Sequence, residues 1–466
     1  RDVFNLMDKL RPTATGLDLI PAWFLRLVAP VFAAPISQLF NQSIIQAVVP
    51  VQWKKAFICP IPKVTHPESP VDFRPISITP VLSQIMEKLV VRNYIYPALL
   101  TPPQTLTFQD QFAFRPTGST TAALIAFYHH ICEMLSTNSY VRVIALDFSK
   151  AFDTVRHATL FEKLARLDIP DEVYNWIRDF FQARSQSTKF SGDESDFAEL
   201  LASIFQGSGV GPACYVITAG DLQTLNVKNK LLKYADDTYL IIPAETTLTV
   251  ADEIRHIEAW SKENNLNLNR AKSREIIFTR TRARCHQVIY PPVIADIPRV
   301  EKLTVLGVVV NAKLTVSDHV TEVIHSCSRN LYALKMLQTH GLTGQSLHHV
   351  FTAAIQSKLL YCSPAWSGFT TAADRRRLDV FIRRSKRYGY CSPDALPVSE
   401  LFDNADNALF RAIINNSSHI LGHFLSIKSR NNYNARHRKH NFELIKKTTS
   451  LGDRNFLIRM LYKDIY

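Results

Sequence analysis

Two adjacent carboxylates lie between apolar runs in the stretch LKYADDTYLII, residues 232–242. The flanking runs are typical of short buried strands, so Asp236 and Asp237 are expected at the tip of a hairpin. Like charges so close together are costly unless a positive partner compensates them. A divalent metal is such a partner, because Mg²⁺ prefers carboxylate oxygens together with substrate phosphates. The stretch therefore predicts a metal site, although an isolated ADD is more simply interpreted as a solvated turn.

A third carboxylate and a glycine-rich loop strengthen this interpretation. Asp147 ends the apolar strand VIALD, far upstream of Asp236. Three acids on neighbouring strand ends could hold two metal ions about 3.5–4 Å apart, the arrangement used for in-line phosphoryl transfer. The loop QGSGVGP, residues 206–212, has a backbone that can approach a ligand closely. Its alternative interpretation is an ordinary glycine loop.

The elements that must position these residues alternate between strands and helices. Helical spacing is clear over 81–100 and 247–264, and the pattern becomes helical and basic from residue 316. Strand-like runs are predicted at 56–61, at 141–147, in LLKY and TYLIIP around the paired acids, and in SREIIF and LTVLGVVVN. The order indicates an α+β body followed by a basic helical module.

Composition narrows the class of protein. The 466 residues carry a formal charge of +13, which favours a polyanionic partner over a merely basic soluble protein. Seven cysteines without a C-x-x-C pair indicate neither a zinc site nor a disulfide framework, and no secretory signal is evident. A reduced intracellular setting is therefore expected. Prolines and Arg26 interrupt the apolar stretch 19–40, so a pair of buried helices is predicted there rather than a membrane span.

Assembled in order, these motifs resemble a reverse transcriptase of the non-LTR (LINE-type) retrotransposons, of the CR1, L2 and Jockey-like lineages. ALDFSKAFDTV is similar to the first catalytic palm motif, QGSGVGP to the substrate loop and YADD to the catalytic hairpin. The remaining similar segments are FRPISITPVLSQIMEKLV and DQFAFRPTGSTTAAL in the fingers, NNLNLNRAKSREIIF in the palm, LTVLGVVVNAKL in the primer grip, and LLYCSPAWSG and NFLIRMLYKDIY further on. The glycine in QGSGVGP departs from the commoner QGSVLGP.

The resemblance implies a metal-binding catalytic centre. Asp147 and Asp236 would be the main ligands of two Mg²⁺ ions, or of Mn²⁺, with Asp237 a third and less direct acid. The backbone carbonyl of Phe148 would help to hold a metal. Lys272 matches the position proposed to protonate the leaving pyrophosphate, although it could equally be a solvated lysine.

The resemblance also implies a nucleotide site. Phe152 stands where the family has an aromatic steric gate against a ribose 2′-OH; plain core packing is the alternative. Lys63 and Arg74 would hold the incoming triphosphate, since the planar arginine fork offers two parallel donors to phosphate. Gln206 and Gly207 would lie against nucleotide and template. Lys150 and Asp153 fit the first palm motif without an assigned role.

The expected fold is a right-hand polymerase, with fingers, a palm built on an antiparallel sheet, a helical thumb and a basic helical C-terminal segment. The predicted divisions are an N-terminal helical extension at 1–50, fingers and palm at 51–310, thumb at 311–400 and the basic segment at 401–466. The expected partners are an RNA template, a DNA primer or target and dNTPs, with no membrane. An endonuclease would come from a missing domain or another protein.

The expected location is the nucleus, with a cytoplasmic ribonucleoprotein stage. Two other functions fit the same residues. One is a catalytically decayed, retroelement-derived nucleic-acid-binding protein. The other is an RNA-templated RNA polymerase, against which Phe152 argues.

Overall fold

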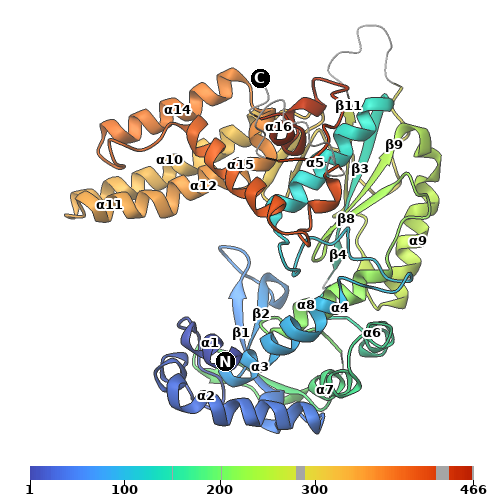
Figure 1. The fold of residues 1–466 in the computed structure, drawn as a ribbon, viewed down its shortest axis with the longest axis vertical. Coiled ribbons are helices and arrows are strands. Elements are labelled where there is room, and N and C mark those ends of the chain that lie inside the picture. The colour runs from blue at the N-terminus through green and yellow to red at the C-terminus, as the bar shows by residue number, and fades with distance from the viewer. Residues whose placement is uncertain (150, 201, 280–288, 427–439, 464–466) are drawn as a thin grey trace. The chain divides into compact units, whose positions relative to one another are not determined.

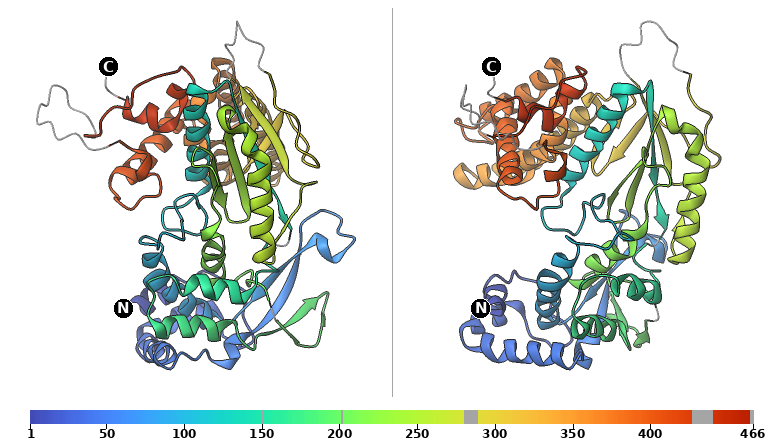
Figure 2. Two further views of the ribbon diagram at one scale, coloured as in Figure 1. Left: turned by 90° about the vertical axis from the view of Figure 1, so that its right-hand side faces the viewer. Right: turned by 45° about the vertical axis from the view of Figure 1, so that its right-hand side comes forward.

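The computed structural model describes residues 1–149, 151–200, 202–279, 289–426 and 440–463. The chain divides into two compact units (Figures 1 and 2). Unit 1 comprises residues 1–115, 148–223 and 254–268, and unit 2 comprises 116–147, 224–253 and 269–466. Each unit is therefore assembled from segments that are distant in the sequence. The predicted division at residues 50, 310 and 400 stays a prediction.

Unit 1 is built on a small mixed sheet. Its strand order is β2-β1-β5-β6, with β7 also paired to β5; β1 runs antiparallel to β2 and parallel to β5. The strands are β1 (Lys55–Pro62), β2 (Phe73–Ile78), β5 (Ser185–Phe190), β6 (Asp193–Glu194) and β7 (Ala198–Glu199). A separate pair joins β4 (Phe148–Ser149) to β10 (Asn267–Leu268). The strand predicted at 56–61 is confirmed as β1.

Helices make up most of the rest of unit 1. They are α1 (Asp2–Asp8), α2 (Ala22–Ile45), α3 (Val81–Val90), α4 (Tyr96–Ala98), α6 (His157–Leu164), α7 (Asp171–Phe181), α8 (Val210–Thr218) and most of α9 (Val250–Glu263). Trp176, Phe180 and Phe181 of α7 are fully buried and stack with one another and with Phe205. The helix predicted at 247–264 is confirmed as α9, and the helical segment predicted at 81–100 is confirmed as α3, a π-helical stretch at Val91–Ile95 and α4.

The prediction of two buried helices at 19–40 was wrong. A single helix, α2, continues through Pro30 and Pro35. It packs on α1 and α7 but leaves apolar side chains in solvent, with Trp23 66% and Leu27 70% exposed. By length and composition α2 is the one helix among the described residues that could cross a membrane. Buried helices of soluble proteins and signal sequences have the same length and composition, so these two properties do not assign α2 to a membrane.

Unit 2 is built on an antiparallel sheet of four strands. The order is β11 (Arg274–Thr279), β3 (Tyr140–Leu146), β9 (Asp237–Pro243) and β8 (Lys230–Tyr234). Helix α5 (Thr120–Thr137) packs on this sheet, where Phe127 meets the rings of Tyr239 and Phe278 at centroid distances of 5.7 and 6.1 Å. The strands predicted beside the paired acids and at 141–147 are confirmed. An antiparallel sheet on an α+β body agrees with the predicted fold class.

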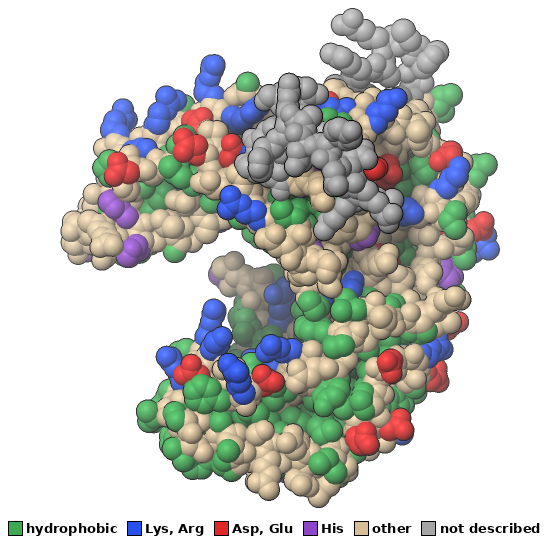
Figure 3. Space-filling model, in the orientation of Figure 1, with side chains coloured by type: hydrophobic (Ala, Val, Ile, Leu, Met, Phe, Trp, Pro, Cys, Tyr) green, Lys and Arg blue, Asp and Glu red, His purple; other side chains and the backbone are tan. Residues whose placement is uncertain are grey.

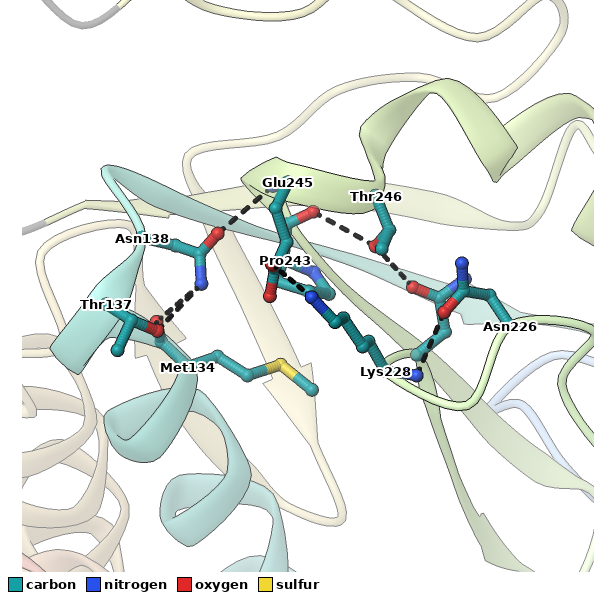
Figure 4. Close-up of polar contacts among 9 residues, drawn as sticks. Met134, Thr137, Asn138, Asn226, Lys228, Pro243, Glu245 and Thr246 are labelled. Carbon is teal, nitrogen blue, oxygen red and sulfur yellow. Dashed lines mark hydrogen bonds and ion pairs between the residues drawn. The ribbon is translucent and has the colours of Figure 1, made fainter.

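A polar network fastens the end of β9 that lies away from the paired acids (Figure 4). The Asn138 amide, just after α5, donates to the Met134 carbonyl at 3.1 Å, and its oxygen accepts the Glu245 N–H at 3.0 Å. The Glu245 carboxylate accepts from the Lys228 ammonium at 2.6 Å. The Thr246 hydroxyl donates to the Pro243 carbonyl. These bonds hold α5, β9 and the segment before β8 together, so the opposite end of the hairpin is built on a fixed base.

The remainder of unit 2 is a hairpin followed by helices. β12 (Lys302–Val305) pairs with β13 (Val308–Asn311), and both positions of its two-residue turn, Leu306 and Gly307, have positive φ. The helices are α10 (Ser317–Thr339), α11 (Gly344–Phe351), α12 (Ser357–Leu360), α13 (Ser363–Trp366), α14 (Ala372–Arg387), α15 (Val398–Ile414) and α16 (Phe456–Leu461). The helical region predicted from residue 316 is confirmed. The described cysteines are all free, and five of these six are buried.

Candidate active site

The paired acids lie at the tip of the β8–β9 hairpin, as predicted. Tyr234 is the register partner of Asp237, which leaves Ala235 and Asp236 as the two-residue turn. Ala235 has φ +55°, the left-handed conformation that tight two-residue hairpin turns require at their first central position. Asp236 and Asp237 are both exposed. The turn therefore breaks strand alternation at the point where the two carboxylates stand.

The sheet register brings the third acid to the same edge. β3 and β9 are antiparallel with Leu146 opposite Thr238, so the next position along that register sets Asp147 opposite Asp237. Directly opposed residues of an antiparallel pair point to the same face of the sheet. Asp147 is half-buried and directly follows β3. Pairing of central strands thus unites acids that are far apart in the chain.

The three carboxylates interact electrostatically. The pKa of Asp237 is raised to about 6, first by desolvation and then by the negative charges of Asp236 and Asp147. Asp237 therefore binds a proton more readily than a free Asp does. None of the causes of this shift is a basic group, so repulsion from the other two acids is one part of the raised pKa of Asp237. A bound cation would relieve this repulsion.

A closed protein cage for a metal is not present in the described parts of the chain, where no group of three or more His, Cys, Asp or Glu is placed to hold an ion. The acids nevertheless fit a Mg²⁺ site of the open kind, which uses one or two carboxylates and completes its shell with water and substrate phosphates. The raised pKa of Asp237 supports that fit, because crowded carboxylates favour a cation. The assignment of Asp147, Asp236 and Asp237 as ligands stays a prediction.

The main chain of Asp147 is clamped from both sides. Its N–H donates to the Ser273 hydroxyl at 3.1 Å, and its carbonyl accepts the Asn269 N–H at 2.8 Å. Ser273 is 1% exposed and donates in turn to the Asn269 carbonyl at 2.8 Å. Sequence reasoning missed both residues, although they bracket Lys272 in the motif NRAKS. Lys272 itself is exposed on this turn.

The predicted triphosphate ligands lie on the β1–β2 ribbon of unit 1. Arg74 is opposite Ile61, and Lys63 follows β1 on the same alternating face as Ile61. Both basic side chains are exposed. The Lys63 ammonium donates to the Val71 carbonyl at 2.9 Å. The ribbon thus carries two cations on one face, as a phosphate site requires.

The glycine-rich loop is held in place by its neighbours in unit 1. The Gln206 carbonyl accepts the Ser77 N–H at 2.7 Å, and its side-chain amide donates to Asp153 at 3.0 Å. Gly207 has φ +119°, and a Cβ there would clash with the Ser77 carbonyl, so only glycine fits. Asp153, which had no predicted role, therefore positions Gln206.

Buried Glu87 is a second residue that sequence reasoning missed. It lies on α3 and is fully buried; its carboxylate accepts the Gly209 N–H at 2.6 Å, the Val210 N–H at 3.3 Å and the Ser83 hydroxyl at 2.8 Å. A Cβ at Gly209 would lie 3.0 Å from the Glu87 side chain. The glycine that departs from the commoner loop sequence thus lets α3 approach. No signal in the sequence indicated this role, because Glu87 lies among the polar positions of its helix.

Phe152 lies beside the same loop. Its ring stacks on Tyr215 with centroids 4.5 Å apart and meets the edge of Phe114 at 6.4 Å. Its carbonyl accepts the Ile204 N–H at 2.7 Å, next to Gln206. The ring is half-buried, so it is fixed on one side and open on the other. Phe148 is buried against Trp260, and the role of its carbonyl stays a prediction. Lys150 lies outside the described residues.

Unit 2 also carries basic surfaces. On α14, Arg383 and Arg384 are exposed and Lys386 is half-buried, and Figure 3 shows Lys and Arg side chains along the edge formed by this region. A cleft of about 800 Å³ between the β12–β13 turn and α10 is lined by His319, Arg329 and Lys358 among others. The His319 Nε2 atom is buried and has no partner within the described ranges. These features are suited to an anionic ligand.

Known proteins to which this chain is similar are named as RNA-directed DNA polymerases. The sequence pattern of the family described as "Reverse transcriptase (RNA-dependent DNA polymerase)" matches residues 61–310. The "Probable RNA-directed DNA polymerase from transposon X-element" of Drosophila melanogaster is 27% identical over 322 residues, 66% of this chain and 34% of that protein. The "RNA-directed DNA polymerase from mobile element jockey" of the same fly is 27% identical over 69% of this chain and 36% of its own length.

The chain therefore spans about a third of the length of these curated relatives. Among solved structures, an apo telomerase from Candida tropicalis, truncated from its C-terminal domain, shares 16% identity. It covers 61% of this chain and 59% of its own, with a TM-score of 0.38.

Proposed function

Since the chain belongs to the reverse transcriptase (RNA-dependent DNA polymerase) family, as its motifs predicted, we propose that it adds deoxynucleotides to a DNA 3′-OH on an RNA template. The observation that carries this proposal is the edge of the unit 2 sheet. There the β3–β9 register sets Asp147 opposite Asp237, beside Asp236 at the hairpin tip. Three acids gathered at strand ends are suited to phosphoryl transfer.

The acids would hold two divalent cations, Mg²⁺ or Mn²⁺, with help from the Phe148 carbonyl. When bound, these ions supply charge neutralisation and acidify the attacking hydroxyl. Asp147 and Asp236 act as the main ligands, while Asp237 acts less directly. The clamp from Ser273 and Asn269 orients Asp147 through its main chain. These residues therefore fix where the primer end reacts.

In the reaction, the primer 3′-oxygen forms a bond to the α-phosphorus of the dNTP, and the bond from that phosphorus to the bridging oxygen breaks. Pyrophosphate leaves with the electron pair, while the hydroxyl proton passes to solvent. Lys272 donates a proton to the leaving pyrophosphate. Lys63 and Arg74 bind the triphosphate, because both are exposed cations on one face of the β1–β2 ribbon.

Nucleotide selection is assigned to the loop of unit 1. Gln206 and Gly207 lie against nucleotide and template, in a conformation fixed by Ser77 and Asp153. The Phe152 ring, braced by Tyr215, excludes a ribose 2′-OH. The packing of this half-buried ring supports the role, since a side chain that excludes ribonucleotides must keep its position when a ribose 2′-OH approaches it.

The basic surfaces of unit 2 bind the nucleic acid. The α14 cations contact phosphates of the primer–template duplex, and the cleft beside the β12–β13 turn takes the primer backbone. Both assignments are supported by their exposed cations. An endonuclease, from a further domain or a partner protein, would supply the 3′-OH. Such a reaction belongs in the nucleus, which localisation of a tagged chain would test.

The proposal is tested by primer extension on an RNA template with Mg²⁺ and with Mn²⁺. Asp236→Asn should lower extension by more than about 100-fold, the scale of losing a group that stabilises reacting charge. RNA binding should persist, because it is mostly electrostatic. Asp193→Asn, an exposed acid on β6, is the matched control and should leave extension unchanged. Full extension by Asp236→Asn would refute the assigned metal site.

The same assay separates the other functions. Wild-type protein should incorporate dNTPs and reject rNTPs, whereas an RNA-templated RNA polymerase would show the reverse preference. Phe152→Val should admit rNTPs if the ring is the gate; unchanged sugar selectivity would leave it as core packing. A decayed nucleic-acid-binding protein would bind the template and extend nothing.

A further inference from the structure

A smaller cavity in unit 2 lies between α5 and the C-terminal segment 445–458. It encloses about 260 Å³. Helix α5 contributes His129 and Ser136, and the C-terminal segment contributes Lys446, Lys447, Asp453 and Asn455. We call this cavity the C-terminal pocket. It lies on the helix that covers the catalytic sheet, but no residue assigned above to catalysis or to primer binding lines it.

The pocket has a polar wall with unmet hydrogen bonds. Asn455 is 1% exposed; its Oδ1 accepts the Leu457 N–H at 2.9 Å, while its Nδ2 has no partner among the residues that the structure describes. The Asp453 Oδ1 atom is likewise buried and without a partner in those ranges. Buried polar atoms without partners are rare in proteins, and each calls for a specific explanation. Here a donor and an acceptor belong to residues that line one cavity.

A flat, uncharged ring forms another part of the wall. Burial, and to a smaller extent the charge of His423, lowers the pKa of His129 to about 4. His129 is therefore neutral near pH 7. Its ring packs against Phe424 with centroids 4.8 Å apart, which holds its orientation. An oriented aromatic ring offers a stacking surface to a planar ligand.

Two exposed lysines belong to the lining. The Lys447 ammonium lies 4.2 Å from the centroid of the Tyr462 ring, so its stem is held against the protein, and Lys446 is its neighbour in the chain. Ammonium groups next to a small aromatic pocket are suited to a phosphate attached to the ligand. Such a lining is suited to a ligand that combines a planar polar ring with a phosphate.

We propose that the C-terminal pocket binds one unpaired nucleotide of the template RNA, with its base inside and its phosphate on Lys446 and Lys447. The edge of a splayed-out base presents donors and acceptors side by side, which match Asp453 and Asn455. Single-stranded RNA is preferred over duplex, because a paired base cannot expose that edge. This proposal rests on the proposed function, which makes single-stranded RNA the template.

Two variants test the pocket in the full chain. Asn455→Asp keeps the oxygen that accepts from Leu457 and removes the donor, while Ser136→Trp fills the cavity from α5. Asn441→Asp is the control, since it makes the same charge change at an exposed position shortly before the C-terminal segment. Binding of a fluorescent single-stranded RNA 20-mer and of an RNA–DNA hybrid of equal length is measured at fixed salt without divalent metal.

Both pocket variants should bind the single strand about tenfold more weakly, the scale of one lost base contact, and the hybrid within about twofold of wild type. The control should match wild type on both. Equal losses on both nucleic acids, or no loss on the single strand, would overturn the proposal. Competition by free UMP or AMP at micromolar concentration would assign the pocket to free nucleotides and overturn it too. Failure of the proposed function would instead appear as absent primer extension by wild type.

Discussion

Two carboxylates with raised pKa values stand in opposite surroundings. Glu87 in unit 1 is fully buried, and the hydroxyl of Ser83 and the N–H groups of Gly209 and Val210 donate to it. Asp237 in unit 2 is exposed at a hairpin, and its charged neighbours are the acids Asp236 and Asp147. Desolvation is the largest cause of the rise in pKa for both.

The remaining causes separate structure from chemistry. Every other contribution at Glu87 lowers its pKa, because hydrogen bonds and the Arg184 charge stabilise the anion. Every other contribution at Asp237 raises it further. The Glu87 carboxylate is stabilised by its donors and holds the glycine-rich loop in place. The Asp237 carboxylate is repelled by its acidic neighbours, which suits the binding of a cation.

The largest effect is expected from Glu87→Leu. It leaves two N–H groups and a hydroxyl without a partner and buried Arg184 without its counter-charge. The free energy of unfolding should fall by about 3 kcal/mol, as measured by urea denaturation. Glu87→Gln, which keeps an acceptor oxygen, should lose less. Equal stability of Glu87→Leu and wild type would contradict a structural role for this carboxylate.

Asp237→Asn should show the opposite pattern. Extension should fall at least about tenfold, equivalent to ~1.4 kcal/mol of transition-state stabilisation. The free energy of unfolding without divalent metal should not fall, because the substitution removes repulsion from Asp236 and Asp147. The two measurements are made on one protein preparation. If the substitution lowered both stability and activity, Asp237 would have a structural role like that of Glu87, and the distinction between the two carboxylates would be wrong.

Ala235→Gly tests the backbone of the acidic turn. Alanine at φ +55° is strained, and glycine there should raise the free energy of unfolding by up to about 1 kcal/mol. Ala259→Gly, at an exposed position within α9, is the matched control and should lower it by about 1 kcal/mol. Equal effects of the two substitutions would show that the turn is not strained.

The smallest effect is expected in the pH dependence of stability, since water screens exposed Asp237. Its pKa is raised from 3.8 to about 6 on folding, so the folded protein binds more protons between these values. Stability should therefore decrease as pH rises from about 4 to 6 in the absence of metal. Thermal melting of wild type and Asp237→Asn in EDTA measures it: the difference should grow over that window. A constant difference would show that folding does not raise the pKa of Asp237.

Much of the fold followed from local pattern. Strand-like runs such as VIALD and TYLIIP, and helical spacing at 81–100, are short-range signals that the structure reproduced as β3, β9 and the helices α3 and α4. The exception was α2, where Pro30 and Pro35 lie inside one helix. Sequence rules treat interior proline as a break, yet packing on α1 and α7 keeps the helix continuous.

The sequence predicted those parts of the candidate site whose chemistry depends on the type of residue alone. Paired aspartates, an acid at the end of a strand and glycines in a loop can be recognised in the sequence as candidate site residues, because few other side chains could bind a metal or let the backbone approach a ligand. Glu87, Asp153 and Ser273 did not, because each acts through a hydrogen bond to a residue distant in the chain. The spacing of residues in the sequence does not indicate which distant residue each of these side chains will hydrogen-bond.

The sequence by itself determined which candidate groups this protein carries, namely three acids, the Phe152 ring and basic side chains, and the family to which the chain belongs. Only the tertiary structure decided that Asp147 lies opposite Asp237 and that Gly209 rests on Glu87. Strand register and helix approach depend on side-chain packing between segments far apart in the chain. Local propensity contains no information about which of those segments meet.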